Sequence, residues 1–99
     1  MLGFNKTILV GRLGNNPSLK TSNGHDYALF SVCNKIVDKD GNETTQIQKC
    51  VALDKQCALV MQYLRKGDLC CIEGRIDNYG KSQKVIAERI TFLQRKSDK

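Results

Sequence analysis

The chain has 99 residues, 40% of them hydrophobic and 26% charged, which is the composition of one small folded domain and excludes a disordered segment. Its apolar runs are short and its first residues lack the apolar stretch of a signal peptide, so we expect no membrane span and a cytoplasmic location. Sixteen Lys and Arg against ten Asp and Glu give a net charge of +6, which favours a polyanionic partner such as nucleic acid.

Clusters of Gly, Pro, Asn and Asp, the residue types that tight turns need, divide the sequence into segments. Five of these segments alternate between two faces with the period of a β-strand: residues 6–13, 26–36, 44–53, 68–76 and 84–93. The first predicted strand carries apolar side chains on both faces, because Leu9 alternates with Ile8 and Val10. We therefore expect another subunit to cover one of its faces, so that the chain forms at least a dimer.

A helix is predicted over residues 54–66, where the alternation stops. Apolar residues recur there at the spacing of one helix face: Cys57, Val60, Met61 and Leu64. Asp54 stands where a side chain can cap the N-terminus. Arg65 and Lys66 suit the negative C-terminal end, and Gly67 can adopt the left-handed conformation that ends a helix.

The predicted order is three strands, one helix and two strands. This is the plan of the OB-fold, an all-β, five-stranded, partly open barrel with one helix between strands 3 and 4. We assign residues 1–94 to this domain and residues 95–99 to a short basic tail.

The sequence contains five cysteines: Cys33, Cys50, Cys57, Cys70 and Cys71. Their number is odd, no two have the C-x-x-C spacing, and the single histidine, His25, has no partner at ligand spacing. We therefore predict reduced core thiols, no metal site and no cofactor.

The sequence NKTILVGRLG at residues 5–14, followed by Pro17, resembles the opening of bacterial-type single-stranded DNA-binding proteins. The segments NG at 23–24, YLRKG at 63–67 and CIEGR at 71–75 extend the resemblance over most of the chain, from Asn5 to Leu93. The resemblance implies an OB barrel that binds single-stranded DNA without strong sequence preference in replication, recombination or repair. It also implies a homotetramer built from dimers, with a dimer as the alternative, and replication proteins as further partners.

The sequence departs from this family at its aromatic positions and at its end. Ile47 occupies a strand position where a stacking tryptophan is typical, and Leu53 stands where the family often has Phe. A basic stub replaces the family's acidic C-terminus, so we expect a short form that lacks that tail.

A single strand of DNA offers a phosphate chain and exposed base faces. We predict phosphate contacts from basic residues of the strands and the loops that ring the barrel: Lys6, Arg12, Lys35, Lys49, Lys55, Arg75, Lys81 and Lys84. Among these, Lys49 matches a basic position of the family. With few aromatic residues for stacking, we expect affinity to come mainly from charge and from several subunits acting together.

Apolar and aromatic residues supply the predicted base contacts. Ile47 and Leu53 offer apolar contact, Tyr79 stands in the loop between the last two strands as a stacking candidate, and Tyr27 is a further one. Three other aromatic residues lie within apolar-periodic runs and are predicted to be core: Phe30, Tyr63 and Phe92.

Other functions are less well supported. The sequence has no P-loop, H-E-x-x-H or G-x-S-x-G motif, so we predict no enzyme. Asp38, Asp40 and Asn42 resemble the start of a calcium-binding loop, but Glu43 and Lys49 stand where that loop requires Gly and Glu. Two alternatives remain open: an OB-fold assembly module of a replication or primosome complex that mainly binds protein, and RNA binding in the same groove.

Overall fold

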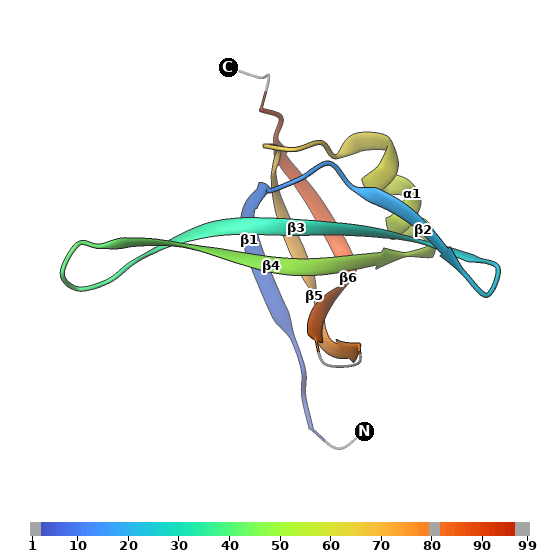
Figure 1. Cartoon of the computed structure of the whole chain (residues 1–99), viewed down its shortest axis with the longest axis horizontal. Coiled ribbons are helices and arrows are strands. Elements are labelled where there is room, and N and C mark those ends of the chain that lie inside the picture. The colour runs from blue at the N-terminus through green and yellow to red at the C-terminus, as the bar shows by residue number, and fades with distance from the viewer. Residues whose placement is uncertain (1–2, 80–81, 97–99) are drawn as a thin grey trace.

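The computed structural model describes residues 3–79 and 82–96. Its elements follow in the order β1 (Thr7–Leu13), β2 (Ser18–Ser22), β3 (His25–Val37), β4 (Glu43–Leu53), α1 (Asp54–Tyr63), β5 (Leu69–Tyr79) and β6 (Ser82–Gln94) (Figure 1). α1 has ten residues, and no helix in these ranges is long and apolar enough to cross a bilayer.

Five of the strands close into a barrel. β1 pairs antiparallel with β5, β5 antiparallel with β6, β6 parallel with β4, and β4 antiparallel with β3. β3 then returns to β1 through the pairs Arg12–Cys33 and Leu13–Val32, which completes the ring. The single helix lies between β4 and β5. This arrangement confirms the predicted OB-fold.

A sixth strand, β2, was not predicted. All five of its residues are exposed, so the segment carries no alternating apolar pattern. It forms because it pairs with β3 from Ser18–Leu29 to Ser22–His25. Asn23 (φ 52°) and Gly24 (φ 78°) connect the two strands, and positive φ at both central residues is the requirement of the tight hairpin turn that suits the twist of paired strands.

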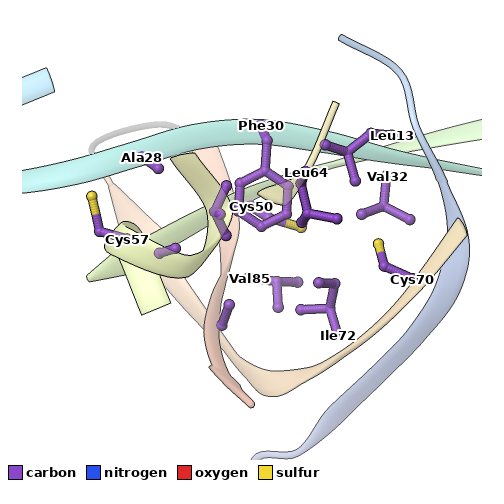
Figure 2. Packing of buried hydrophobic residues seen from close by; sticks show 13 residues of the cluster. Leu13, Ala28, Phe30, Val32, Cys50, Cys57, Leu64, Cys70, Ile72 and Val85 are labelled. Atoms are coloured by element: carbon purple, nitrogen blue, oxygen red, sulfur yellow. The ribbon is translucent and has the colours of Figure 1, made fainter. Parts of the chain in front are cut away.

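The core fills the barrel from several strands and from one face of α1. Figure 2 shows Leu13, Phe30, Val32, Ile72 and Val85 pointing toward one another from different strands. The predicted helical stripe is confirmed. Cys57 and Val60 of α1 are buried, as is Leu64 directly after the helix, and Met61 packs against them partly buried. This part of the chain therefore covers one end of the barrel.

The ends of α1 differ from the prediction. Asp54 is the first helical residue and no side chain caps the N-terminus, because β4 runs directly into α1 and the change of direction falls on Asp54 itself (φ 52°). The helix ends at Tyr63, earlier than predicted. Arg65 still serves this end, since its Nη1 donates to the Met61 carbonyl at 3.0 Å. Gly67 does have positive φ (93°), but it lies in the turn that leads to β5.

Two glycines allow backbones to cross closely inside the barrel. A side chain at Gly11 would collide with the carbonyl oxygen of Cys33, where β1 crosses β3. A side chain at Gly74 would collide with the carbonyl oxygen of Ile86 on β6. Both positions therefore require glycine for steric reasons.

The five cysteines are all free thiols: Cys33, Cys50, Cys57, Cys70 and Cys71. Cys50, Cys57 and Cys70 are buried, as predicted for core residues, whereas Cys33 and Cys71 are half-buried. Burial raises the pKa of Cys50 to about 12 and that of Cys70 to about 11. These two side chains are therefore protonated, unreactive thiols at neutral pH.

Of the predicted basic tail at residues 95–99, the structure describes Arg95 and Lys96. The backbone N–H of Lys96 donates to Oδ1 of Asp68 at 3.0 Å. Oδ2 of the same carboxylate accepts from the backbone N–H of Arg65 at 2.9 Å. Asp68 thus ties the chain after β6 to the turn that follows α1.

Candidate nucleic-acid interface

The β3–β4 ribbon has one face toward the core and one toward solvent. In Figure 1 it runs as one long ribbon in front of the barrel, and its hairpin extends past the other strands. Ala28, Phe30 and Val32 of β3 point inward and are buried. Since side chains alternate along a strand, the residues between them point outward.

The register shows which residues share the outward face, because directly paired residues lie on the same side of a sheet. Lys20 of β2 pairs with Tyr27, which pairs with Leu53. Further along the ribbon, Ser31 pairs with Lys49 and Cys33 with Ile47. We call this surface the ribbon face and define it by the outward residues Lys20, Tyr27, Leu29, Ser31, Cys33, Lys35, Ile47, Lys49, Val51, Leu53 and Lys84.

Two adjoining hollows of about 380 Å³ each lie on the ribbon face. Tyr27 and Leu53 line one of them, and Lys20 and Lys49 line the other. Lys84 of β6 lines both, so the hollows form one continuous groove. The groove combines apolar surface at one end with cationic side chains at the other.

The groove is electropositive. Lys20 and Lys49 are exposed, and within residues 3–79 and 82–96 neither forms an ion pair. Lys84 Nζ donates to Ser82 Oγ at 3.3 Å. Lys35, further along the ribbon, lies 3.7 Å from Glu43, and both side chains are more than 60% exposed, so this pair is weak and leaves the lysine available to an anion.

The structure thus brings together Lys35, Ile47, Lys49, Leu53 and Lys84 among the residues predicted to contact DNA. Arg75 continues the same outer surface, because it pairs with Ile86, which pairs with Val51. The Arg75 guanidinium forms an ion pair with Glu88 at 3.0 Å.

Other predicted residues lie elsewhere. Arg12 donates to the Gly67 carbonyl at 2.9 Å and to Gln94 Oε1 at 3.2 Å, contacts that hold β1 to the end of the barrel. Lys6 is exposed just before β1, and Lys55 is exposed in the first turn of α1. Lys81 and the side chain of Tyr79 lie outside the described part of the chain.

In the Asp-rich loop between β3 and β4, the carboxylate of Asp38 accepts hydrogen bonds from the backbone of the same loop. Asp38 Oδ1 accepts from the N–H groups of Asp40 and Asn42, at 2.9 Å each. These hydrogen bonds, that of Asn42 first, lower the pKa of Asp38. In the described residues, no group of three or more His, Cys, Asp or Glu side chains is placed to hold a metal ion.

Residues 4–93 match the sequence pattern of the Single-strand binding protein family. The chain belongs to this family. The single-stranded DNA-binding protein of Xylella fastidiosa is 36% identical over 110 residues, which cover 97% of this chain and 67% of that protein. The protein of the same name from Bacillus cereus is 35% identical and covers 92% of this chain. Single-stranded DNA-binding protein 1 of Staphylococcus aureus is 32% identical and covers 95%. The chain spans 61% of the length of the Bacillus protein and 68% of the Staphylococcus protein.

Lys20 is a groove residue that the sequence reasoning missed, because β2 was not predicted. The signal that could have found it is the Asn23–Gly24 pair, whose preference for tight hairpins predicts a strand on each side. Tyr27, named from the sequence as a further stacking candidate, is half-buried and lines the groove.

The prediction that Tyr63 and Phe92 are core residues is wrong. They are 42% and 44% exposed, whereas Phe30 is only 3% exposed and is a core residue as predicted. The two exposed rings contact each other, with centroids 5.7 Å apart and planes tilted by 52°. Both stand at the ends of their elements, Tyr63 as the last residue of α1 and Phe92 near the end of β6, where the barrel no longer encloses them.

Proposed function

We propose that this chain binds single-stranded DNA with little sequence preference along the groove of the ribbon face, and so protects it during replication, recombination or repair. The observation that carries the proposal is the continuous groove. Lys20, Lys49 and Lys84 line it next to the apolar surface of Tyr27 and Leu53. Membership of the Single-strand binding protein family supports it. Both findings favour a binding protein over an enzyme and DNA over a domain that mainly binds protein.

Binding follows from two kinds of contact. The lysine side chains attract phosphates, which carry no base identity, and this accounts for weak sequence preference. Bases turn toward Tyr27, Leu53 and Ile47, of which only Tyr27 provides an aromatic face. A duplex hides its base faces and is too stiff to follow a curved barrel, so it loses the second kind of contact.

A second copy of the chain is part of this proposal. Ile8 and Val10 on the outer face of β1 are 59% and 51% exposed, and β1 pairs with β5 from Thr7 to Arg12 but with β3 only at Arg12 and Leu13. An exposed apolar face on a strand with one partly unpaired edge fits a twofold contact with the same face of another chain. We propose at least a dimer, and a tetramer built from such dimers, in which several grooves hold one strand together.

Binding to labelled oligo(dT), to a duplex of equal length and to oligo(U), measured by fluorescence anisotropy over a salt series, tests the function. Contact from Lys20, Lys35, Lys49 and Lys84 predicts a log–log salt slope of about −2.8 for each subunit engaged, from about −0.7 per phosphate neutralised on a single strand. The double variant Lys20→Ala with Lys49→Ala should reduce the slope by about half.

Arg95→Ala is the matched control, because Arg95 lines hollows near the end of α1 and neither hollow of the groove. This variant should keep the wild-type slope. Equal or tighter binding to duplex, or a slope near zero, would overturn the proposal. Tighter binding to oligo(U) would change the ligand to RNA.

A further inference from the structure

A second, smaller hollow is lined by residues from the end of α1, the start of β5 and the end of β6. Its volume is about 210 Å³, and its apolar walls are Tyr63, Leu64, Leu69, Phe92 and Leu93. A cavity of about 150 Å³ lined by such side chains already holds one benzene ring. The hollow therefore has room for one bulky apolar side chain.

Three of the five apolar walls of this hollow are exposed to solvent, whereas Leu64 is buried and Leu69 half-buried. Phe92 and Leu93 are 44% and 49% exposed, and Tyr63 is 42% exposed. The tilted contact between the rings of Tyr63 and Phe92 holds both in place without covering them. An apolar surface that is fixed in position and open to solvent is typical of an interaction site.

Cationic residues surround the hollow on one side. A wider depression shares Tyr63 and Asp68 with it and is bordered by Arg65, Lys66, Arg95 and Lys96. In the described ranges none of these four forms an ion pair.

Among the described residues that line the hollow and the depression, Asp68 is the only carboxylate; it is 7% exposed and already accepts two backbone hydrogen bonds. The stem of Lys96 lies over Gly67, which has no side chain to displace it. The depression is thus a cationic rim beside an apolar pocket.

We propose that this site binds an acidic peptide segment of a partner protein, with one bulky apolar side chain in the hollow and its carboxylates on the rim. Charge complementarity identifies the ligand as acidic, and the size of the hollow identifies its apolar anchor. The site shares no residue with the groove of the ribbon face, so the peptide and single-stranded DNA bind the same chain together.

A nucleic acid fits this site less well. Tyr63 and Phe92 contact each other, so no slot for a base exists between them. A base placed in the hollow instead would bury its polar edges against Leu64, Leu69 and Leu93 without hydrogen-bond partners, which is costly. A phenylalanine or leucine side chain meets no such cost.

The test uses a fluorescein-labelled peptide of sequence Asp-Glu-Asp-Phe-Leu-Asp-Glu and its twin with Ser in place of Phe and Leu. Fluorescence anisotropy should show binding of the first peptide and about tenfold weaker binding of the twin, because the apolar anchor is lost. Arg95→Glu should weaken binding of the first peptide by about tenfold, since an attraction becomes a repulsion. Phe92→Ala should weaken it as well, and saturating unlabelled oligo(dT) should leave it bound.

Lys39→Glu is the charge-matched control, since Lys39 is exposed in the loop between β3 and β4 and far from this site in the fold, and it should bind the peptide like wild type. Arg95→Glu tests the site even if Phe92→Ala loses stability. No binding, equal binding to the twin, or displacement by oligo(dT) would overturn the proposal. A change in sedimentation mass for Arg95→Glu without peptide would identify the surface as a contact between copies and would also overturn it.

Discussion

At the residue scale, some of the aromatic side chains lie at different places from those that the sequence predicted. Tyr27, which pairs with Lys20 on one side and Leu53 on the other, lines the groove of the ribbon face and is half-buried there, whereas Phe30, which also lines it, is a core residue. Tyr63 and Phe92 stand at another surface. Ile47 and Leu53 are 66% and 38% exposed on the ribbon face. Their exposure leaves them available for apolar contact with bases.

We predict that Tyr27→Ala weakens binding to oligo(dT) by roughly 5- to 150-fold, the equivalent of about 1–3 kcal/mol for one stacked base. Tyr27→Phe retains the ring and should bind like wild type. Because the substitution removes no charge, the salt slope should stay unchanged, which separates stacking from phosphate contact. Equal titration curves for Tyr27→Ala and wild type would show that no base stacks there.

At the element scale, the β2–β3 hairpin places Lys20 beside the groove. β2 contributes no buried residue, so its position depends on the ladder with β3 and on the turn at Asn23 and Gly24. The groove therefore depends on a local turn as much as on the barrel.

We predict that Gly24→Val destabilises this turn by about 1–2 kcal/mol, because a side chain is unfavourable at φ 78°. Amide hydrogen exchange in β2 should become faster while the core strands keep their protection. The salt slope for oligo(dT) should fall by about 0.7 as Lys20 leaves the groove. Gly24→Asn, a residue that tolerates positive φ, should restore most of both properties. Unchanged exchange in β2 would contradict this account.

At the scale of the whole molecule, barrel closure assembles the site from distant segments. Lys20, Lys49 and Lys84 come from β2, β4 and β6 and meet only because β4 pairs with β3 on one edge and with β6 on the other. The same closure leaves Ile8 and Val10 exposed on the outside of β1.

We predict that Ile8→Lys shifts the assembly toward monomers in sedimentation velocity, because it places a charge in an apolar contact between copies. Since Ile8 is 59% exposed in the single chain, circular dichroism should show an intact barrel. Ile36→Lys is the matched control, as Ile36 is 46% exposed on the β3–β4 ribbon and lies beyond Cys33, the last residue of β3 that pairs with β1. An unchanged mass for Ile8→Lys would show that this face is not an interface.

The sequence by itself determined the barrel strands, the helix with its buried stripe and the family. These depend on local alternation, on the helical spacing of Cys57, Val60 and Leu64, and on the motifs that carry the resemblance. Single positions on the ribbon face, such as Lys49 and Ile47, also followed from the strand pattern and the resemblance.

Only the tertiary structure decided the position of β2, the place of Lys20 beside Tyr27 and the exposure of Tyr63 and Phe92. β2 has no apolar period of its own and exists through its ladder with β3. Tyr63 and Phe92 carry the apolar pattern of core residues, yet they stand where their elements run past the enclosed part of the barrel. A local pattern reports which face of an element is apolar, but how far the surrounding strands extend decides whether that face is covered.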